Sequence, residues 1–140
     1  MKWKQRVGDV VSIGRGVAQC PRATLELPRL ARSVGRPTLE QRVPWLPFVL
    51  VDFLASRVTT ADRVFEFGGG GSTLWFAARA GSVITVEHDA DWVNVLGSRV
   101  AGLPNVTLLN PEDGVGYAEY VQSIDAYDDD AFTVVVVDGR

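Results

Sequence analysis

Residues 63–87, RVFEFGGGGSTLWFAARAGSVITVE, decide the fold of this chain. The stretch opens with a short β-rich run at 63–67, passes through four glycines at 68–71, and continues to a second β-rich segment at 83–86. The residues between the glycines and that segment have the composition of a short helix, which we expect Gly81 to close. A strand, a helix and a second strand in this order predict a βαβ unit with parallel strands.

The same alternation continues toward the end of the chain. The further predicted elements are a helix that Asp89 or Asp91 caps and that ends near Gly102, a strand at 106–109, a helix at 116–124 and a strand at 132–137. The last strand contains four consecutive valines, Val134 to Val137, which fit a strand covered on both faces. The sequence therefore predicts an α/β fold with a parallel sheet of about four strands and flanking helices.

The first 43 residues differ from the rest in charge and in patterning. They carry nine Lys or Arg against three Asp or Glu, a net charge of +6 in a chain whose total is −3. Glycine and proline interrupt any helical period there, which predicts a basic, loosely ordered arm with short helices at 1–43 and a domain at 44–140. The arginines are spread out and lack interleaved aromatic residues, so we interpret them as solvated charges and assign no nucleic-acid partner.

Composition also excludes several classes of protein. The chain has one cysteine and one histidine, which rules out an internal disulfide and a cysteine-based zinc site, and no metal is expected. No apolar run approaches the roughly 20 residues that a membrane-spanning helix needs, and no secretory signal is recognisable. We therefore expect a cytoplasmic protein without a transmembrane segment.

The glycine loop and two acids predict a ligand site. Glycines let the backbone approach a ligand closely, and the amides that begin the following helix attract negative groups. Ser72 or Thr73 is expected to cap that helix. Glu87 ends the second strand about 20 residues beyond the loop, the offset at which an acid binds ribose hydroxyls in doubly wound folds.

The acid ahead of the loop indicates which nucleotide is bound. Glu66 would repel the pyrophosphate of a dinucleotide in a low-dielectric cleft, whereas it favours the cationic end of S-adenosylmethionine. The amides of Gly70 to Thr73 would then receive the carboxylate of that cofactor. The loop also lacks the lysine of a phosphate-binding loop of the Walker type.

These residues resemble motifs of a known family. Glu66 to Thr73, then Val86 to Asp89, and then Val135 to Gly139 look like the first, second and fourth motifs of class I S-adenosylmethionine-dependent methyltransferases, with Ser72 at the third glycine position. The resemblance implies a Rossmann-like fold. It further implies that Glu66, Gly68, Gly70 and Ser72 bind the methionine part, that Glu87 binds the ribose, that His88 and Asp113 lie near the adenine, and that Asp138 faces the transferred methyl group as a catalytic residue.

Two of these residues can also be interpreted as purely structural, without a role in ligand binding or catalysis. His88 stands between two acids and is also interpretable as a surface or hydrogen-bonded histidine, and Asp138 as a capping residue at a strand end. The full fold of this family has further strands, so we expect the sheet to be incomplete after its fourth strand and the exposed edge of that strand to pair with another chain.

Three functions stay open from the sequence. The first is a methyltransferase acting on a small-molecule or glycan-like acceptor, active or inactive as this short chain. The second is a noncatalytic nucleotide-binding or interaction module. The third is an NAD-dependent oxidoreductase, which Glu66 disfavours.

Overall fold

The computed structural model describes residues 26–111 and 117–137. The chain divides into two compact units, residues 1–36 and 37–140. The described part of the first unit holds one helix, α2 (Leu27–Ser33), which has a proline in its first turn and ends with the Val34 N–H bonded to the Leu30 carbonyl at 3.0 Å. The expected boundary between residues 43 and 44 stays a prediction.

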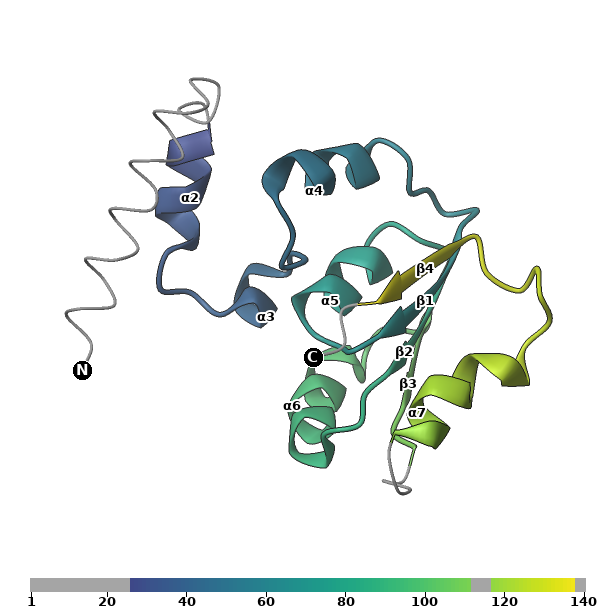
Figure 1. Cartoon of the computed structure of the whole chain (residues 1–140). Coiled ribbons are helices and arrows are strands. Elements are labelled where there is room, and N and C mark those ends of the chain that lie inside the picture. Colours follow the sequence, from purple (N-terminus) through teal and green to yellow (C-terminus); the bar gives the residue numbers. More distant parts are fainter. Residues whose placement is uncertain (1–25, 112–116, 138–140) are drawn as a thin grey trace. The chain divides into compact units, whose positions relative to one another are not determined.

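The second unit is built on a parallel sheet (Figure 1). Its strands are β1 (Arg63–Phe67), β2 (Ser82–Val86), β3 (Val106–Leu109) and β4 (Val134–Val137), and their order across the sheet is β3-β2-β1-β4. All three neighbouring pairs are parallel. The predicted α/β class and the Rossmann-like parallel sheet of four strands are therefore confirmed.

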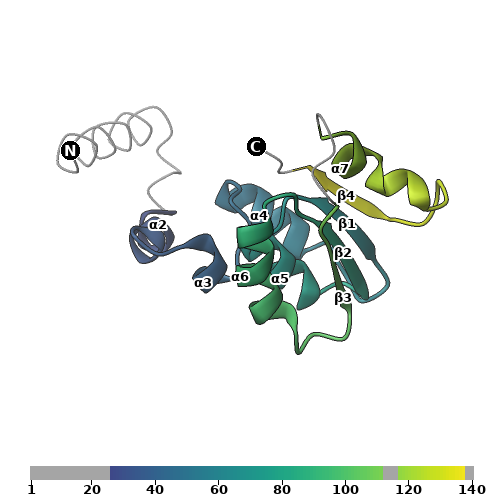
Figure 2. The same cartoon turned by 90° about the horizontal axis from the view of Figure 1, so that it is seen from below.

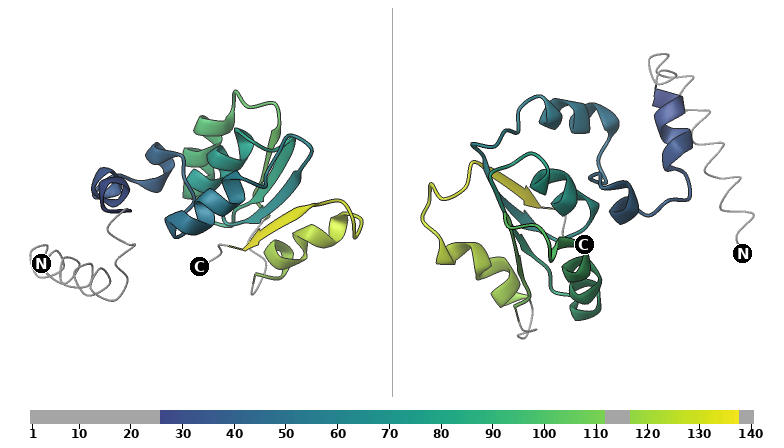
Figure 3. Two further views of the ribbon diagram at one scale, coloured as in Figure 1. Left: turned by 90° about the horizontal axis from the view of Figure 1, so that it is seen from above. Right: turned by 180° about the vertical axis from the view of Figure 1, so that it is seen from behind.

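Helices cover both faces of this sheet. They are α3 (Thr38–Gln41), α4 (Phe48–Ala55), α5 (Gly71–Ala77), α6 (Ala90–Val100) and α7 (Ala118–Gln122), the last continued by the 3-10 turn η2 (Ser123–Ala126). Figure 2 and Figure 3 show α4, α5 and α6 on one face and α7 on the other. None of the helices in residues 26–111 and 117–137 has the length and apolar character needed to cross a membrane.

The main core lies between the sheet and α4 and α5. Val64 of β1, Phe76 of α5 and Val83 of β2 are at most 1% exposed and belong to one apolar cluster. Burying a side chain of the size of Phe76 stabilises the fold by roughly 1.5–3 kcal/mol. A second cluster forms around Leu96 of α6, which is fully buried against β3. Together these contacts fix α5 and α6, the two helices that follow β1 and β2.

Two details of the sequence prediction were wrong. The helix after the glycines ends at Ala77 and is not closed by Gly81, whose missing side chain instead allows close approach to the Thr60 carbonyl. The valines of β4 are not covered on both faces, because Val135 is 50% exposed and Val137 76% exposed. Strand residues alternate between the faces of a sheet, and only Val134 and Val136 point to the core cluster.

Polar contacts tie the starts of β1 and β4 together. The Thr133 hydroxyl donates to Asp62 Oδ1 at 2.9 Å and accepts the Arg63 N–H at 3.0 Å. Asp62 Oδ2 accepts the Thr59 N–H at 2.8 Å and the Thr59 hydroxyl at 3.1 Å. The Thr59 backbone bond first, and then the two threonine hydroxyls, hold the pKa of Asp62 below its ordinary value of 3.8.

This cluster predicts an acid-dependent loss of stability. A carboxyl group whose pKa is lowered on folding stabilises the native state above its unfolded pKa, and that contribution disappears as the pH falls through the folded pKa. We expect Asp62→Asn to have a lower free energy of unfolding than the wild type at pH 7. At about pH 3 we expect the difference between the two proteins to be smaller. Urea denaturation at both pH values measures this. An equal difference between wild type and variant at the two pH values would contradict the assignment.

Candidate functional site

The glycine loop lies where the order of the strands reverses. From β1 the chain moves through β2 to β3 on one side, and β4 then lies on the other side of β1. In open parallel sheets, ligands bind at the carboxyl ends of the strands beside such a reversal. Gly68 begins the loop with a φ of 83°, which strongly favours glycine, and its N–H donates to the Val86 carbonyl at 2.8 Å. The loop is thus tied to the end of β2.

Glu87 fixes the next residue of the loop. Its carboxylate Oε2 accepts the Gly69 N–H at 3.0 Å, and Oε1 accepts the Asp89 N–H at 2.9 Å. Glu87 is 6% exposed, so these bonds form in a mostly dry environment where they are stronger than in water. Glu87 therefore lies next to the glycine loop, as the sequence predicts.

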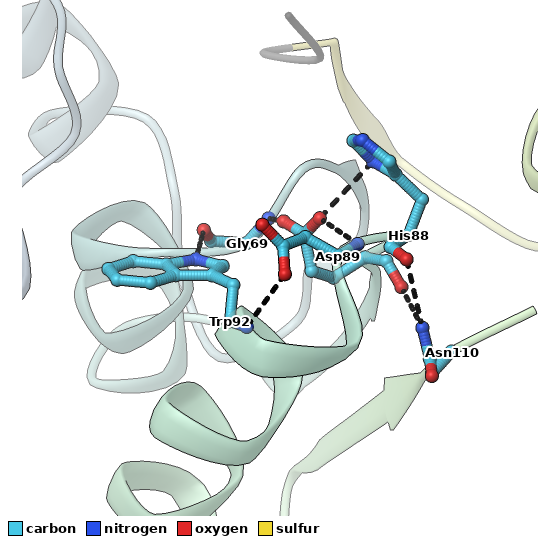
Figure 4. Close-up of polar contacts among 6 residues, drawn as sticks. Gly69, His88, Asp89, Trp92 and Asn110 are labelled. Carbon is cyan, nitrogen blue, oxygen red and sulfur yellow. Dashed lines mark hydrogen bonds and ion pairs between the residues drawn. The ribbon is translucent and has the colours of Figure 1, made fainter.

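Trp92 fixes the carbonyl group of Gly69, the second polar backbone group of that residue. Its indole N–H donates to the Gly69 carbonyl at 2.7 Å (Figure 4). The Trp92 backbone N–H in turn donates to Asp89 Oδ1 at 3.0 Å, which makes Asp89 the cap of α6, one of the two candidates predicted. Gly69 therefore has its N–H and its carbonyl each fixed by a side chain that lies at or after the end of β2.

Packing also requires glycine at position 69 but leaves position 70 open. A β-carbon added to Gly69 would collide with Leu96 Cδ2 and lie 2.8 Å from Thr85 Cγ2. A β-carbon added to Gly70 would meet no heavy atom within 4 Å. Gly69 thus allows the loop to pack closely against its neighbours, whereas Gly70 has free space at the position of a β-carbon.

This difference predicts unequal effects of two alanine substitutions. Gly69→Ala is expected to destabilise the chain by about 1–3 kcal/mol, because its methyl group overpacks against the buried Leu96. Gly70→Ala is the matched control, and its stability should stay within about 1 kcal/mol of wild type. Urea denaturation of both variants measures this, and equal midpoints would show that the loop does not pack on α6 as described.

Glu66 lies beneath the loop and not on its surface. Its side chain is fully buried between the sheet and α5, and its Oε2 accepts the Thr73 hydroxyl at 2.6 Å and the Thr85 hydroxyl at 2.8 Å. Thr73 Oγ1 also accepts the Gly70 N–H at 3.0 Å. The two acids therefore reach the same loop from different sides, Glu87 directly at Gly69 and Glu66 through Thr73 at Gly70.

His88 lies in a small cluster of aromatic rings at the ends of the strands. Its ring centroid is 5.1 Å from that of Tyr117 and 5.3 Å from that of Tyr120, and its Nδ1 is 3.2 Å from Glu87 Oε1. The Asn110 side-chain amide donates to the Glu87 carbonyl at 2.8 Å, which joins the end of β3 to the end of β2. His88 thus packs against two tyrosine rings beside Glu87, and both interpretations of this residue stay open.

The structure brings together most of the residues predicted for the site. Ser72, 5% exposed, is the second residue of α5 and lies beside the loop. Asp113 and Asp138 lie outside the described residues. Within residues 26–111 and 117–137, no group of three or more His, Cys, Asp or Glu side chains is arranged to hold a metal ion. The roles in ligand binding given to Glu66, Gly68, Gly70, Ser72, Glu87 and His88 stay predictions.

Comparison with known proteins gives matches among solved structures only. No family model matches the sequence, and no curated protein matches it. The chain is similar to a dimethyladenosine transferase from Plasmodium falciparum, with a TM-score of 0.39 and 24% identity over 48% of this chain and 26% of the other. It is also similar to the 23S rRNA methyltransferase ErmE, with a TM-score of 0.36 and 20% identity over 49% of this chain and 36% of the other.

These comparisons correct one expectation about partners. The sequence assigns no nucleic-acid partner, and this part of the expectation is at odds with the comparisons, since one of the similar solved structures is an rRNA methyltransferase. The glycine loop and its acids point to a cofactor, and they carry no information about the acceptor. The aligned part spans about a quarter to a third of the two similar chains. This chain has a Rossmann-like α/β fold, and the similar solved structures are methyltransferases.

Proposed function

We propose that the second unit binds S-adenosylmethionine at the glycine loop and serves methyl transfer. The observation that carries this proposal is the position of Glu87, a nearly buried carboxylate fixed against Gly69 at the carboxyl ends of β1 and β2. Each carboxylate oxygen can accept more than one hydrogen bond, so Glu87 keeps capacity for two ribose hydroxyls beside its two backbone partners. Gly70 leaves open space next to it for the rest of the ligand.

The loop amides favour this cofactor over a dinucleotide. A pyrophosphate site needs backbone N–H groups that point at the phosphates. Here the Gly69 N–H is directed to Glu87 and the Gly70 N–H to Thr73, so two successive amides are bonded within the protein. The Gly70 amide is therefore also engaged before it could receive the carboxylate of S-adenosylmethionine, as the sequence predicts for it. A buried acid beneath the loop further disfavours a phosphate group, whereas it is compatible with an ammonium or sulfonium group.

The residues of this chain would bind and orient the reactants. Glu87 holds the ribose, the loop at Gly68 and Gly70 borders the methionine part, and His88 with Asn110 lies on the side of the adenine. When bound, S-adenosylmethionine supplies a methyl group that its sulfonium already activates, so alignment is the main requirement on the protein. Asp138 is proposed to face the reacting methyl group. The described residues point to no particular acceptor.

Calorimetric titration of the whole chain tests the choice of cofactor. We expect saturable binding of S-adenosylmethionine and of S-adenosylhomocysteine at one site, and no saturable binding of NAD⁺. Binding of NAD⁺ in preference to S-adenosylmethionine would overturn the proposal. Cofactor binding without transfer of a labelled methyl group to any acceptor, RNA included, would limit the chain to a noncatalytic module.

A further inference from the structure

The geometry points to Thr73 and Glu66 as positioning residues, which set the orientation of the Gly70 peptide rather than contact the ligand. This inference rests on the proposed function and refines it, because the sequence alone places Glu66 beside the cationic end of the cofactor. The relevant contacts form one continuous series from the buried acid to the loop.

The series begins at a carboxylate that no solvent reaches. Glu66 is 0% exposed, and the hydroxyl of Thr73 donates to its Oε2 at 2.6 Å. A hydroxyl group has a single proton. Because the Thr73 hydroxyl donates that proton to Glu66, its oxygen can only accept in any other hydrogen bond. The Gly70 N–H occupies that acceptor at 3.0 Å. The acid thus determines which way the Thr73 hydroxyl points, and that hydroxyl determines where the Gly70 amide points.

The orientation of this peptide matters because Gly70 has no side chain to hold it. A β-carbon at Gly70 would meet no heavy atom within 4 Å, so side-chain packing could not fix the residue. Gly69, in contrast, is fixed by Glu87, by Trp92 and by close packing against Leu96. The hydrogen bond to Thr73 is therefore the side-chain contact described for Gly70, which precedes α5 as its N-cap residue.

Thr85 provides a comparison within the same network. Its hydroxyl donates to the same oxygen of Glu66 at 2.8 Å and lies 3.5 Å from the Thr73 hydroxyl. It lies opposite Glu66 in the register of β1 and β2, and no hydrogen bond joins it to the glycine loop among the contacts described. Both threonines satisfy the buried acid, but only Thr73 connects that acid to Gly70.

A pair of threonine-to-valine substitutions tests this inference. Valine keeps the shape of threonine and removes the hydroxyl. In the ligand-free chain, Thr73→Val is expected to speed hydrogen exchange of the Gly70 amide by roughly tenfold, since that amide loses its acceptor. Thr85→Val should change it less than about threefold, and Thr73→Ser should restore the wild-type rate. NMR exchange measurements under conditions where all variants are folded give these rates.

Affinity for S-adenosylhomocysteine gives the second readout. Thr73→Val is expected to weaken binding by roughly tenfold, with rescue in Thr73→Ser and little change in Thr85→Val. Unchanged Gly70 exchange in Thr73→Val, or equal losses of affinity in the two valine variants, would overturn the positioning role. Absence of binding in the wild type would refute the proposed function instead, and the exchange rates of the free chain would still decide the role of Thr73.

Discussion

Gly70→Val is expected to weaken binding of S-adenosylmethionine by about 100-fold, which corresponds to about 2.7 kcal/mol, while the chain stays folded. A β-carbon added to Gly70 would meet no heavy atom within 4 Å, so the first atom of the new side chain has room beside the buried loop. Its methyl groups would instead occupy the space that the ligand needs beside the loop. Calorimetric affinity together with urea denaturation measures the two effects separately.

Gly102→Val is a matched control for this substitution. Gly102 follows α6, and a β-carbon there also meets no heavy atom within 4 Å, but the residue lies away from the loop. This control should bind the cofactor as the wild type does. If Gly70→Val also binds with unchanged affinity, the open space beside the loop is not the ligand site.

Glu87→Ala is expected to reduce cofactor affinity by about 100-fold and to lower stability as well. A carboxylate that accepts hydrogen bonds from ribose hydroxyls contributes about 1.5–3 kcal/mol for each charged bond. The backbone amides of Gly69 and Asp89 would lose their acceptor, which costs about 1–3 kcal/mol for each group that stays buried. Glu119→Ala, which removes an exposed acid on α7, is the control and should change neither quantity.

A ligand without ribose hydroxyls separates the two effects of Glu87→Ala. The wild type should bind an S-adenosylhomocysteine analogue that lacks the 2′- and 3′-hydroxyls about 100-fold more weakly than S-adenosylhomocysteine itself. The variant should bind both ligands with similar affinity, because the interaction is already missing. If removing the hydroxyls weakens binding equally in wild type and variant, Glu87 supports the loop but does not bind the ribose.

Much of the fold could be predicted from local pattern. Each strand of the sheet was expected within two residues of its observed bounds, because short apolar runs between glycines and capping residues mark strands clearly. Asp89 was one of two candidate caps for the following helix, because Asp91 is an equally suitable residue two positions later. The exposure of Val135 and Val137 was not predictable, since an apolar run is equally compatible with a strand covered on one face or on two.

The position of Glu87 next to the loop could be predicted from the sequence. The contacts that support the loop could not. Glu87 follows from the offset between the loop and the end of the second strand, which is a property of the sequence. Thr73 and Thr85 are ordinary residues of a helix and a strand, and only the register of β1 and β2 shows that they meet at Glu66. The indole of Trp92 carried a signal, because an N–H group on a helix that packs near a backbone turn needs an acceptor.

We propose that an adenosyl ligand binds against Gly69 and Glu87. NMR spectra of the labelled chain during titration with S-adenosylhomocysteine test it most directly, with the Trp92 indole signal assigned from its absence in Trp92→Phe. We predict that the Gly69 amide and the Trp92 indole N–H shift together and saturate with the ligand, while the Trp75 indole signal in the core stays in place. Saturable binding that leaves the Gly69 and Trp92 signals unchanged would place the ligand elsewhere and contradict the claim.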